Sequence, residues 1–348
     1  MQTAHASTGR PADTVRPRAA LAMAPEAADG VLDAAALAAL AELTDLVPPP
    51  ALADFTTERA RRVLADTELL ITGWGCPPID ERVLAAAPHL RAIVHTAGSV
   101  RGHVGAACWR RGIEVSSAAR ANALPVAEYT LAMILLANKG VLEAARDYRA
   151  ARAREHWQYA GPEQGNYQRT VGILSASLTG RRVIELLRPH DLHVLLYDPY
   201  VSAEQAAALG ARAVDLPELF AASDVVSVHT PLLPETRGLV SRELLAALRP
   251  GATLINTARG AVVDQQALTE ALLAGRVRAV LDVTEPDQLP PDHPLWTCEN
   301  ALLTPHIAGS QGTELRRLAA VAVDEVRRWA RGEGFAHAVP PERAAYLA

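Results

Sequence analysis

The sequence predicts an α/β protein with two doubly wound parallel-sheet domains. Short apolar runs typical of buried strands alternate with stretches typical of helices along most of the 348 residues. This alternation forms two series, and the second begins at Thr170. A chain of this length can bury two sizeable cores, and hydrophobic residues make up 49% of it.

The first series follows residues 1–16, a polar stretch rich in Ala, Pro and Thr that we expect to be a disordered tail. The next run, RAALAM, predicts a strand; a weak signal peptide is the alternative, which the brevity of the run disfavours. Further along, strands are expected at ELLITGW and RAIVHTAGS, and helices at LDAAALAALAEL and DERVLAAAPHL. A long helical stretch then starts near Pro125 and is expected to break at Gly140.

The second series has the element order of a doubly wound nucleotide-binding domain. Its expected strands are TVGIL, HVLLYD, VVSVHT, ATLINTA, RAVLDV and ALLTPH. Its expected helices are GRRVIELLRPH, SAEQAAALG, PELFAAS, SRELLAALRPG and DQQALTEALLAG. The stretch GTELRRLAAVAVDEVRRWARG predicts a terminal amphipathic helix.

Composition limits the possible functions and partners. The net charge of −5 argues against nucleic-acid binding, and no apolar run approaches the roughly 20 residues that span a bilayer. Cys76, Cys108 and Cys298 are scattered, with neither metal-ligand spacing nor a disulfide framework. Cysteines without a disulfide framework fit the reducing cytosol, so we expect a cytoplasmic protein. We also expect neither a metal site nor an association with a membrane.

The stretch TVGILSASLTGRR, residues 170–182, has the setting of a dinucleotide phosphate loop. With the strand that follows, it forms a strand–helix–strand unit of the expected length, about 30 residues. Gly180 occupies the position for close helix–strand packing, and Asp198 ends the second strand. A carboxylate there accepts hydrogen bonds from the ribose hydroxyls and repels a 2′-phosphate, so it favours NAD over NADP. A simple turn residue before Pro199 is the alternative interpretation of Asp198.

Serines replace the first two glycines of the usual phosphate loop. These are Ser175 and Ser177, and their cost is small if the backbone stays at negative φ. A serine hydroxyl can donate to a phosphate, and the helix N-terminus still supplies N–H groups. We expect this loop to contact the cofactor through Ser175, Ala176, Ser177, Leu178, Thr179 and Gly180.

More specific motifs lie further along the chain: INTARG, LDVTEP and TPHIAG. In combination they resemble the D-isomer-specific 2-hydroxyacid dehydrogenase family, which includes glyoxylate/hydroxypyruvate reductases. TGWGCPPID, HTAGSVRG and NALPVAEYTLAMILL are similar to the first half of that family, so the resemblance covers nearly the whole chain.

The resemblance implies a Rossmann cofactor domain, residues 122–310, inserted in a flavodoxin-like substrate domain, residues 17–121 and 311–348. It also implies a homodimer that moves a hydride between NAD and a small 2-oxo acid. The active site of the family lies in a cleft, at the carboxyl ends of the cofactor-domain strands.

Three residues match the catalytic positions of the family. His306 matches the general acid/base, a role that suits imidazole because it titrates near neutral pH. Arg259 matches the arginine that grips the substrate carboxylate and polarises its carbonyl. Asp287 stands where the family usually has the glutamate that stabilises the imidazolium. Glu285 is the alternative acid, and Gln288 replaces a usual proline, which makes this loop a departure from the family.

The remaining site residues also follow from the resemblance. The candidates for the substrate are the Ser99 and Val100 backbone N–H groups, Arg101, and Trp157, with Tyr159 in reserve. Arg101 is as well explained by a solvated side chain, and Trp157 either reaches the active site of the partner subunit or packs on its own subunit. The expected positions near the cofactor are Asn122, Val126, Thr230, Pro231, Ala258 and Asp282, where the alternative for Asp282 is a structural role at a strand end.

The sequence therefore predicts NAD-dependent reduction of a small 2-oxo acid to the D-2-hydroxy acid. A different class of function is an NAD(H)-sensing or catalytically weakened interaction protein, which the serine loop and the shortened acid would suit. Oxidation of formate or phosphite is a third interpretation. The formate branch of the family carries Gln where this chain has Asp287, which argues against it.

Overall fold

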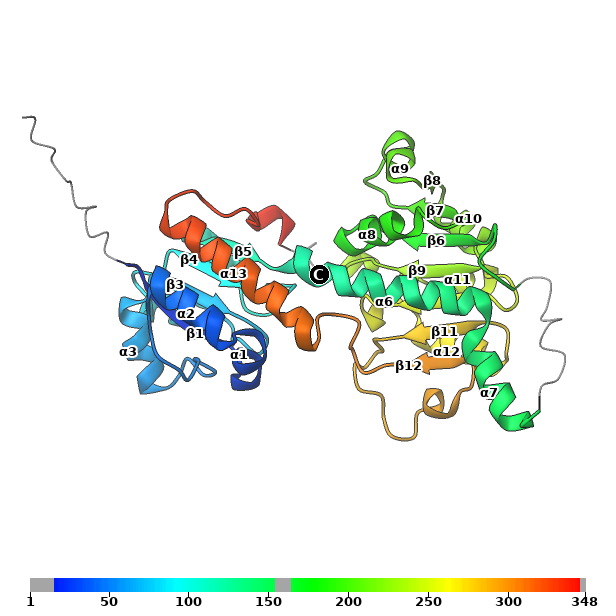
Figure 1. The fold of residues 1–348 in the computed structure, drawn as a ribbon, viewed down its shortest axis with the longest axis horizontal. Helices are drawn as coiled ribbons and strands as arrows, with labels where there is room; N and C mark the ends of the chain where they lie inside the picture. The colour runs from blue at the N-terminus through cyan, green and yellow to red at the C-terminus, as the bar shows by residue number, and fades with distance from the viewer. Residues whose placement is uncertain (1–15, 154–163, 345–348) are drawn as a thin grey trace, which may run out of the picture. The chain divides into compact units, whose positions relative to one another are not determined.

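The structure, a computed structural model, describes residues 16–153 and 164–344 (Figure 1). The chain divides into two compact units. Unit 1 contains the residues up to Thr96 together with Gly102–Ser116 and Ala319–Val339. Unit 2 contains Ala97–Arg101, Ser117–Leu318 and the residues from Pro340 onward. The predicted tail, residues 1–16, falls outside the described residues except for Arg16.

Unit 1 is built on a five-stranded sheet in the order β2-β1-β3-β4-β5. The run RAALAM forms β1, which pairs in parallel with β2 and β3, so the predicted strand is confirmed. Helices α1, α3 and α5 and strands β2 and β5 were not expected from the sequence. The elements are β1 Arg18–Ala22, α1 Pro25–Val31, α2 Ala34–Leu43, β2 Asp45–Leu46, α3 Glu58–Asp66, β3 Leu69–Thr72, α4 Glu81–Ala86, β4 Ala92–His95, α5 Ala106–Arg110, β5 Glu114–Ser117 and α13 Leu315–Ala330.

A polar cluster is buried inside unit 1. Thr72 ends β3, and its Oγ1 lies 3.0 Å from His95 Nδ1 and 3.1 Å from His103 Nε2. The two imidazole rings are 4.5 Å apart between centroids. Burial lowers the pKa of His95 to about 3, helped by the neighbouring His103, and burial lowers the pKa of His103 to about 4. Both imidazoles are therefore uncharged at neutral pH.

Unit 2 is built on a seven-stranded sheet in the order β12-β11-β10-β9-β6-β7-β8. The predicted doubly wound order of this series is confirmed, and only the short strand β8 was not expected. The elements are α6 Ala119–Lys139, α7 Val141–Ala151, β6 Thr170–Leu174, α8 Leu178–Leu187, β7 His193–Tyr197, α9 Ala203–Leu209, β8 Arg212–Ala213, α10 Leu216–Ala222, β9 Val225–Val228, α11 Arg242–Ala247, β10 Thr253–Asn256, α12 Gln265–Leu273, β11 Arg278–Leu281 and β12 Ala301–Leu303.

The long helix α6 packs against α8 and against β9 and β10 of this sheet (Figure 1). It begins at Ala119, six residues before the expected start, and carries Pro125 within it. The predicted break at Gly140 is confirmed: its φ of 66° is left-handed, and α7 begins at the next residue.

The order in which successive strands are added to the sheet changes direction at β6. This strand pairs in parallel with β7 on one side and with β9 on the other. The loop after Leu174 therefore lies at the topological switch point, where ligands bind in doubly wound sheets. None of the helices in the described ranges is long and apolar enough to cross a membrane. Within those ranges no group of His, Cys, Asp and Glu side chains is arranged to hold a metal ion.

Candidate active site

The predicted phosphate loop connects β6 to α8 at the switch point. Ser177 is the N-cap of α8, and its Oγ accepts a hydrogen bond from the Gly180 N–H at 3.2 Å. A Cβ atom at Gly180 would lie 2.0 Å from the Ser175 carbonyl oxygen. Only glycine therefore fits at this position, because the loop backbone passes directly against the first turn of α8.

Ser175 corrects one expectation about this loop. The cost of a serine was expected to be small only if the backbone stays at negative φ, but the φ of Ser175 is 83°, in the left-handed region. A side chain costs about 1–2 kcal/mol in this conformation. The Ser175 hydroxyl offsets part of that cost by donating to Asp198 Oδ2 at 3.2 Å. Ser177, in contrast, has an ordinary φ of −61°.

Asp198 follows β7 and is tied into the loop on both carboxylate oxygens. Its Oδ2 also accepts from the Ala176 N–H at 2.8 Å, and its Oδ1 accepts from the Tyr200 N–H at 2.9 Å. The contact with the Tyr200 N–H is typical of a turn residue, which was the alternative interpretation of Asp198. The carboxylate thus joins the ends of β6 and β7, at the edge where a ribose is expected.

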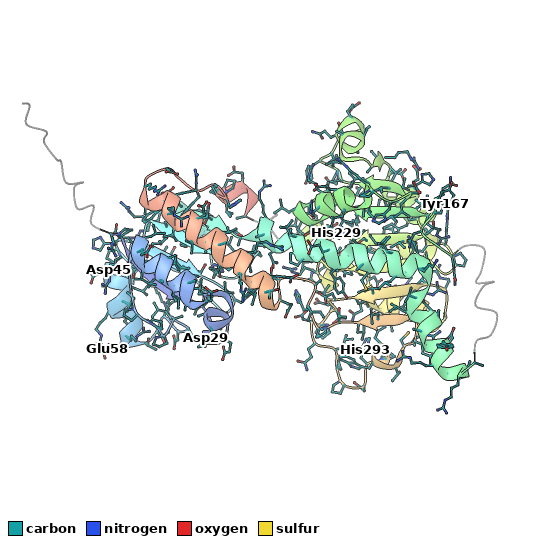
Figure 2. The ribbon with its side chains drawn as sticks, in the orientation of Figure 1. Asp29, Asp45, Glu58, Tyr167, His229 and His293 are labelled. Carbon is teal, nitrogen blue, oxygen red and sulfur yellow. The ribbon has the colours of Figure 1, made fainter. Side chains whose placement is uncertain are left out.

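His229 is a buried residue beside this loop that the sequence analysis did not single out, although it begins the quoted segment HTPLLPETRG (Figure 2). Its backbone N–H donates to the Leu174 carbonyl, and its Nε2 lies 2.9 Å from Ser227 Oγ. Burial lowers the pKa of His229 to about 3, so the ring is neutral at physiological pH. The adjacent Thr230 donates from Oγ1 to the same Leu174 carbonyl at 3.4 Å, which places the predicted adenosine-side segment at the carboxyl end of β6.

Arg259 lies in a turn after β10 that the Asn256 side chain bridges. The Asn256 side chain accepts from the Ala258 N–H at 3.0 Å and donates to the Arg259 carbonyl at 3.0 Å, which fixes the turn. Burial lowers the pKa of the Arg259 guanidinium, Asp287 opposes that effect, and Arg101 adds like-charge repulsion. The Arg259 guanidinium is therefore partly desolvated, and its pKa is affected by one neighbouring carboxylate, Asp287, and one neighbouring cation, Arg101.

Gly260, which follows Arg259, allows a close approach between two segments of backbone. Its φ is not left-handed, but a Cβ there would lie 2.0 Å from the Thr284 carbonyl oxygen and 2.7 Å from the Glu285 nitrogen. The loop that carries Glu285 and Asp287 is called the acidic loop here. The glycine permits its backbone to pass directly against the Arg259 turn. This close approach holds the loop that carries Asp287 against the turn that carries Arg259.

The structure brings Asp287, not Glu285, to His306. Asp287 Oδ1 lies 3.6 Å from His306 Nδ1, within ion-pair range but beyond an ordinary hydrogen bond. Glu285 instead lies 3.6 Å from Arg237, and its backbone exchanges hydrogen bonds with the Gln265 side chain. The geometry thus favours Asp287 as the partner of the histidine.

His306 is held in a left-handed conformation with a φ of 58°. Asp282 stabilises the surrounding backbone: its Oδ1 accepts from the Ile307 N–H at 2.8 Å, and its Oδ2 accepts from the Ala308 N–H at 2.9 Å. Thr304 Oγ1 donates to the same carboxylate at 2.6 Å. Asp282 therefore fills the structural role at a strand end that was one interpretation of it, and a place beside the nicotinamide stays a prediction.

Two side chains contact the segment from Thr304 to Ser310: Tyr129, which was not selected from the sequence, and Asn122, which was. Tyr129, in α6, has its hydroxyl 2.8 Å from Thr304 Oγ1, and Asn122 Oδ1 accepts from the Ser310 N–H at 3.1 Å. Burial raises the pKa of the Tyr129 phenol. Asn122 was expected at the crossover near the nicotinamide, a role that stays a prediction. Thr304 belongs to the TPHIAG motif itself, which was the available signal for it.

The other predicted substrate contacts lie in the segment Ala97–Arg101 of unit 2. The Ser117 hydroxyl donates to the Ala97 and Gly98 carbonyls, which anchors this segment. Val100 is buried, and Arg101 is exposed and donates to the Leu232 carbonyl at 2.5 Å. Trp157 and Tyr159 lie outside the described residues, so their roles stay predictions.

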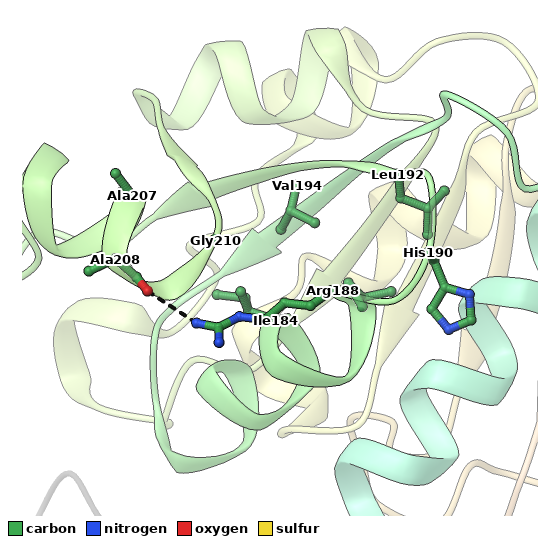
Figure 3. Close-up of a pocket in the computed structure, with 9 residues that line it drawn as sticks. Ile184, Arg188, His190, Leu192, Val194, Ala207, Ala208 and Gly210 are labelled. Atoms are coloured by element: carbon green, nitrogen blue, oxygen red, sulfur yellow. Dashed lines mark hydrogen bonds between the residues drawn. The ribbon is translucent and has the colours of Figure 1, made fainter.

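A surface hollow of about 470 Å³ lies elsewhere in unit 2 (Figure 3). It is lined by Ile184, Leu187, Val194 and Gly210, and Arg188 donates to the Ala208 and Leu209 carbonyls. Val194 lies near the start of β7, whereas Asp198 follows its end. The hollow is therefore at the edge of the sheet opposite the predicted site, and it is not the place where a dinucleotide binds in this kind of sheet.

Comparisons with known proteins agree with this arrangement. Residues 131–308 match the sequence model of the D-isomer specific 2-hydroxyacid dehydrogenase, NAD binding domain. The chain is 37% identical over 265 residues to a D-3-phosphoglycerate dehydrogenase of Mycobacterium leprae, which covers 75% of this chain and 49% of that protein. It is 33% identical over 268 residues to a glyoxylate reductase of Korarchaeum cryptofilum, which covers 76% of this chain and 79% of that protein.

Among solved structures, TT0316 from Thermus thermophilus superposes with a TM-score of 0.74 at 31% identity, covering 93% of this chain and all of that one. The chain spans about half the length of the phosphoglycerate dehydrogenases that it matches.

Proposed function

We propose that this chain, which belongs to the D-isomer specific 2-hydroxyacid dehydrogenase family, reduces a small 2-oxo acid to the D-2-hydroxy acid with NADH and catalyses the reverse reaction with NAD. One observation carries the proposal: Asp287 lies beside His306, and the same acid influences the Arg259 guanidinium. An acid, an imidazole and a partly desolvated cation in one place suit the reduction of a carbonyl next to a carboxylate.

The residues at the switch point fit a dinucleotide. The loop from Ser175 to Ser177 passes against the first turn of α8 with no room for a side chain at Gly180, and the N-terminus of that helix favours an anion. Asp198 lies at the end of the neighbouring strand, as a ribose contact requires. When bound, the nicotinamide supplies or accepts the hydride.

Arg259 binds the substrate carboxylate. Its planar guanidinium stays charged despite burial and holds a 2-oxo acid in one orientation through paired hydrogen bonds. The same positive charge polarises the carbonyl that is reduced, which stabilises the negative charge developing on its oxygen. The backbone N–H groups of Ser99 and Val100 supply further donors to the carboxylate.

His306 delivers the proton. Because its Nδ1 faces Asp287, the proton for the substrate oxygen comes from Nε2. Asp287 stabilises the imidazolium that precedes transfer and keeps the ring in the orientation that presents Nε2. In the reverse direction the same nitrogen accepts the proton of the hydroxy acid.

Glyoxylate and hydroxypyruvate are the substrates that we propose first, and a curated relative named glyoxylate reductase supports the choice. We also propose that the protein is a homodimer and works in the cytoplasm. All three cysteines are free, which fits a reducing compartment.

The test is NADH oxidation by the purified protein with a panel of 2-oxo acids. We expect turnover that is lost in Arg259→Ala and His306→Ala. NADH binding without turnover of any acid would instead favour an NAD(H)-sensing protein, the other class that the sequence allows.

A further inference from the structure

We propose that the Ser175 hydroxyl competes with the ribose of NAD for the Asp198 carboxylate, and that Ser175 thereby lowers the affinity for NAD(H) and narrows the preference over NADP(H). This inference rests on the proposed function, because it assumes that a dinucleotide binds at the switch point. It concerns a contact within this chain's own loop, between residues 175 and 198.

The Asp198 carboxylate can accept only a limited number of hydrogen bonds. An ionised carboxylate has about four acceptor positions, two on each oxygen. Three of those on Asp198 are taken within the chain: Oδ2 by the Ser175 hydroxyl and the Ala176 N–H, and Oδ1 by the Tyr200 N–H. One position remains, whereas a ribose diol presents two hydroxyl donors.

The three donors are not equally replaceable. The Ala176 and Tyr200 N–H groups are backbone groups at 2.8 and 2.9 Å, and withdrawing either would require the loop or the turn to rearrange. The Ser175 hydroxyl sits at 3.2 Å, long for an O–H donor, and moves by rotation about one side-chain bond. It is therefore the donor that the ribose must displace.

The backbone of Ser175 separates this effect from a second one. Its φ of 83° disfavours any residue with a Cβ, so alanine there keeps the backbone strain and removes only the hydroxyl. Glycine removes both. The two substitutions together distinguish competition for Asp198 from relief of strain in the loop.

The competition acts on NAD more than on NADP. A 2′-phosphate has no hydroxyl to donate at that position and is repelled by the carboxylate, so freeing an acceptor on Asp198 gives it little. Removing the Ser175 hydroxyl should therefore widen the difference between the two cofactors. A general weakening or strengthening of the phosphate loop would change both affinities alike.

The experiment is calorimetric titration of NADH and NADPH into wild type, Ser175→Ala, Ser175→Gly and Ser177→Ala, with thermal unfolding of each protein without cofactor. Ser177→Ala is the comparison variant: it removes a hydroxyl of the same loop that caps α8 and does not donate to Asp198, so it should change the affinities for NADH and NADPH alike. We expect Ser175→Ala and Ser175→Gly to bind NADH about threefold to tenfold more tightly than wild type, with NADPH affinity nearly unchanged. Only Ser175→Gly should also unfold at a higher temperature.

Unchanged or weaker NADH binding in Ser175→Ala would overturn the inference, even if Ser175→Gly binds NADH more tightly, and so would an equal gain for NADPH. If Ser175→Ala does not fold, Ser175→Gly decides through the two cofactors: a gain for NADH alone supports competition for Asp198, and an equal gain for NADPH overturns it. The proposed function can fail separately: tighter NADH binding by the variants, with no acid turned over by wild type, supports the inference and removes the enzyme. Absence of NADH binding by all four proteins overturns both.

Discussion

Asp287 faces His306 across 3.6 Å, between Oδ1 and Nδ1, while Glu285, two residues earlier, lies beside Arg237. The shorter aspartate side chain thus reaches ion-pair range of the histidine in the position where the family usually has glutamate.

Asp287→Asn should lower kcat for 2-oxo acid reduction by at least about tenfold, because the imidazolium loses the anion that stabilises it. Steady-state kinetics with NADH and glyoxylate measures this. Glu285→Gln is the matched control and should leave kcat near that of wild type, since its carboxylate faces Arg237. A loss confined to Glu285→Gln would assign the role to the other acid.

Arg259→Ala should lower kcat/KM by about 10²-fold or more, because both the carboxylate contact and the stabilisation of the developing oxyanion disappear. Arg237→Ala is the control: it also removes one positive charge, from the arginine that pairs with Glu285. We expect it to keep most of the activity. Equal losses in the two variants would show that general electrostatics, not a substrate contact, explains the effect.

Gly260→Ala should destabilise the protein by about 1–3 kcal/mol and reduce turnover, because the new methyl group would lie 2.0 Å from the Thr284 carbonyl oxygen. The acidic loop must then move away from the Arg259 turn. Thermal unfolding and kinetics measure the two effects. Gly102→Ala is the control, since nothing lies within 4 Å of its Cβ position and its φ is not left-handed. Full activity in Gly260→Ala would contradict the positioning role.

Acid should destabilise unit 1 through its buried histidines. The pKa of His95 is about 3 and that of His103 about 4 in the folded state, against 6.5 for an ordinary histidine. The stability that depends on these neutral rings is fully present above pH 6.5 and is lost as pH falls toward 4, because only the unfolded chain takes up the protons. Each such proton contributes a slope of about 1.4 kcal/mol per pH unit.

His95→Gln should flatten this dependence when unfolding is followed by denaturant titration across the same pH range. The slope, not the absolute stability, is the readout, because the substitution also alters the contact with Thr72. His89→Gln is the matched control, since His89 is exposed. Equal slopes in wild type and His95→Gln would refute the assignment.

The sequence by itself determined the fold class, the strand and helix order of unit 2, and the motifs that carry Arg259, Asp287 and His306. These features are readable because hydrophobic periodicity and short motifs are local properties of the chain. Short elements such as α5 and β8 escaped for the same reason: they contain too few residues to show a period.

The tertiary structure alone decided how these residues are used. The left-handed φ of Ser175, the partners of Asp198 and the choice between Asp287 and Glu285 depend on segments that are distant in sequence. Asp282 is the clearest example: its motif places it at a strand end, and only the folded chain shows that its carboxylate holds the backbone after His306. A carboxylate binds whichever donors the folded chain brings within about 3 Å, and only packing determines which those are.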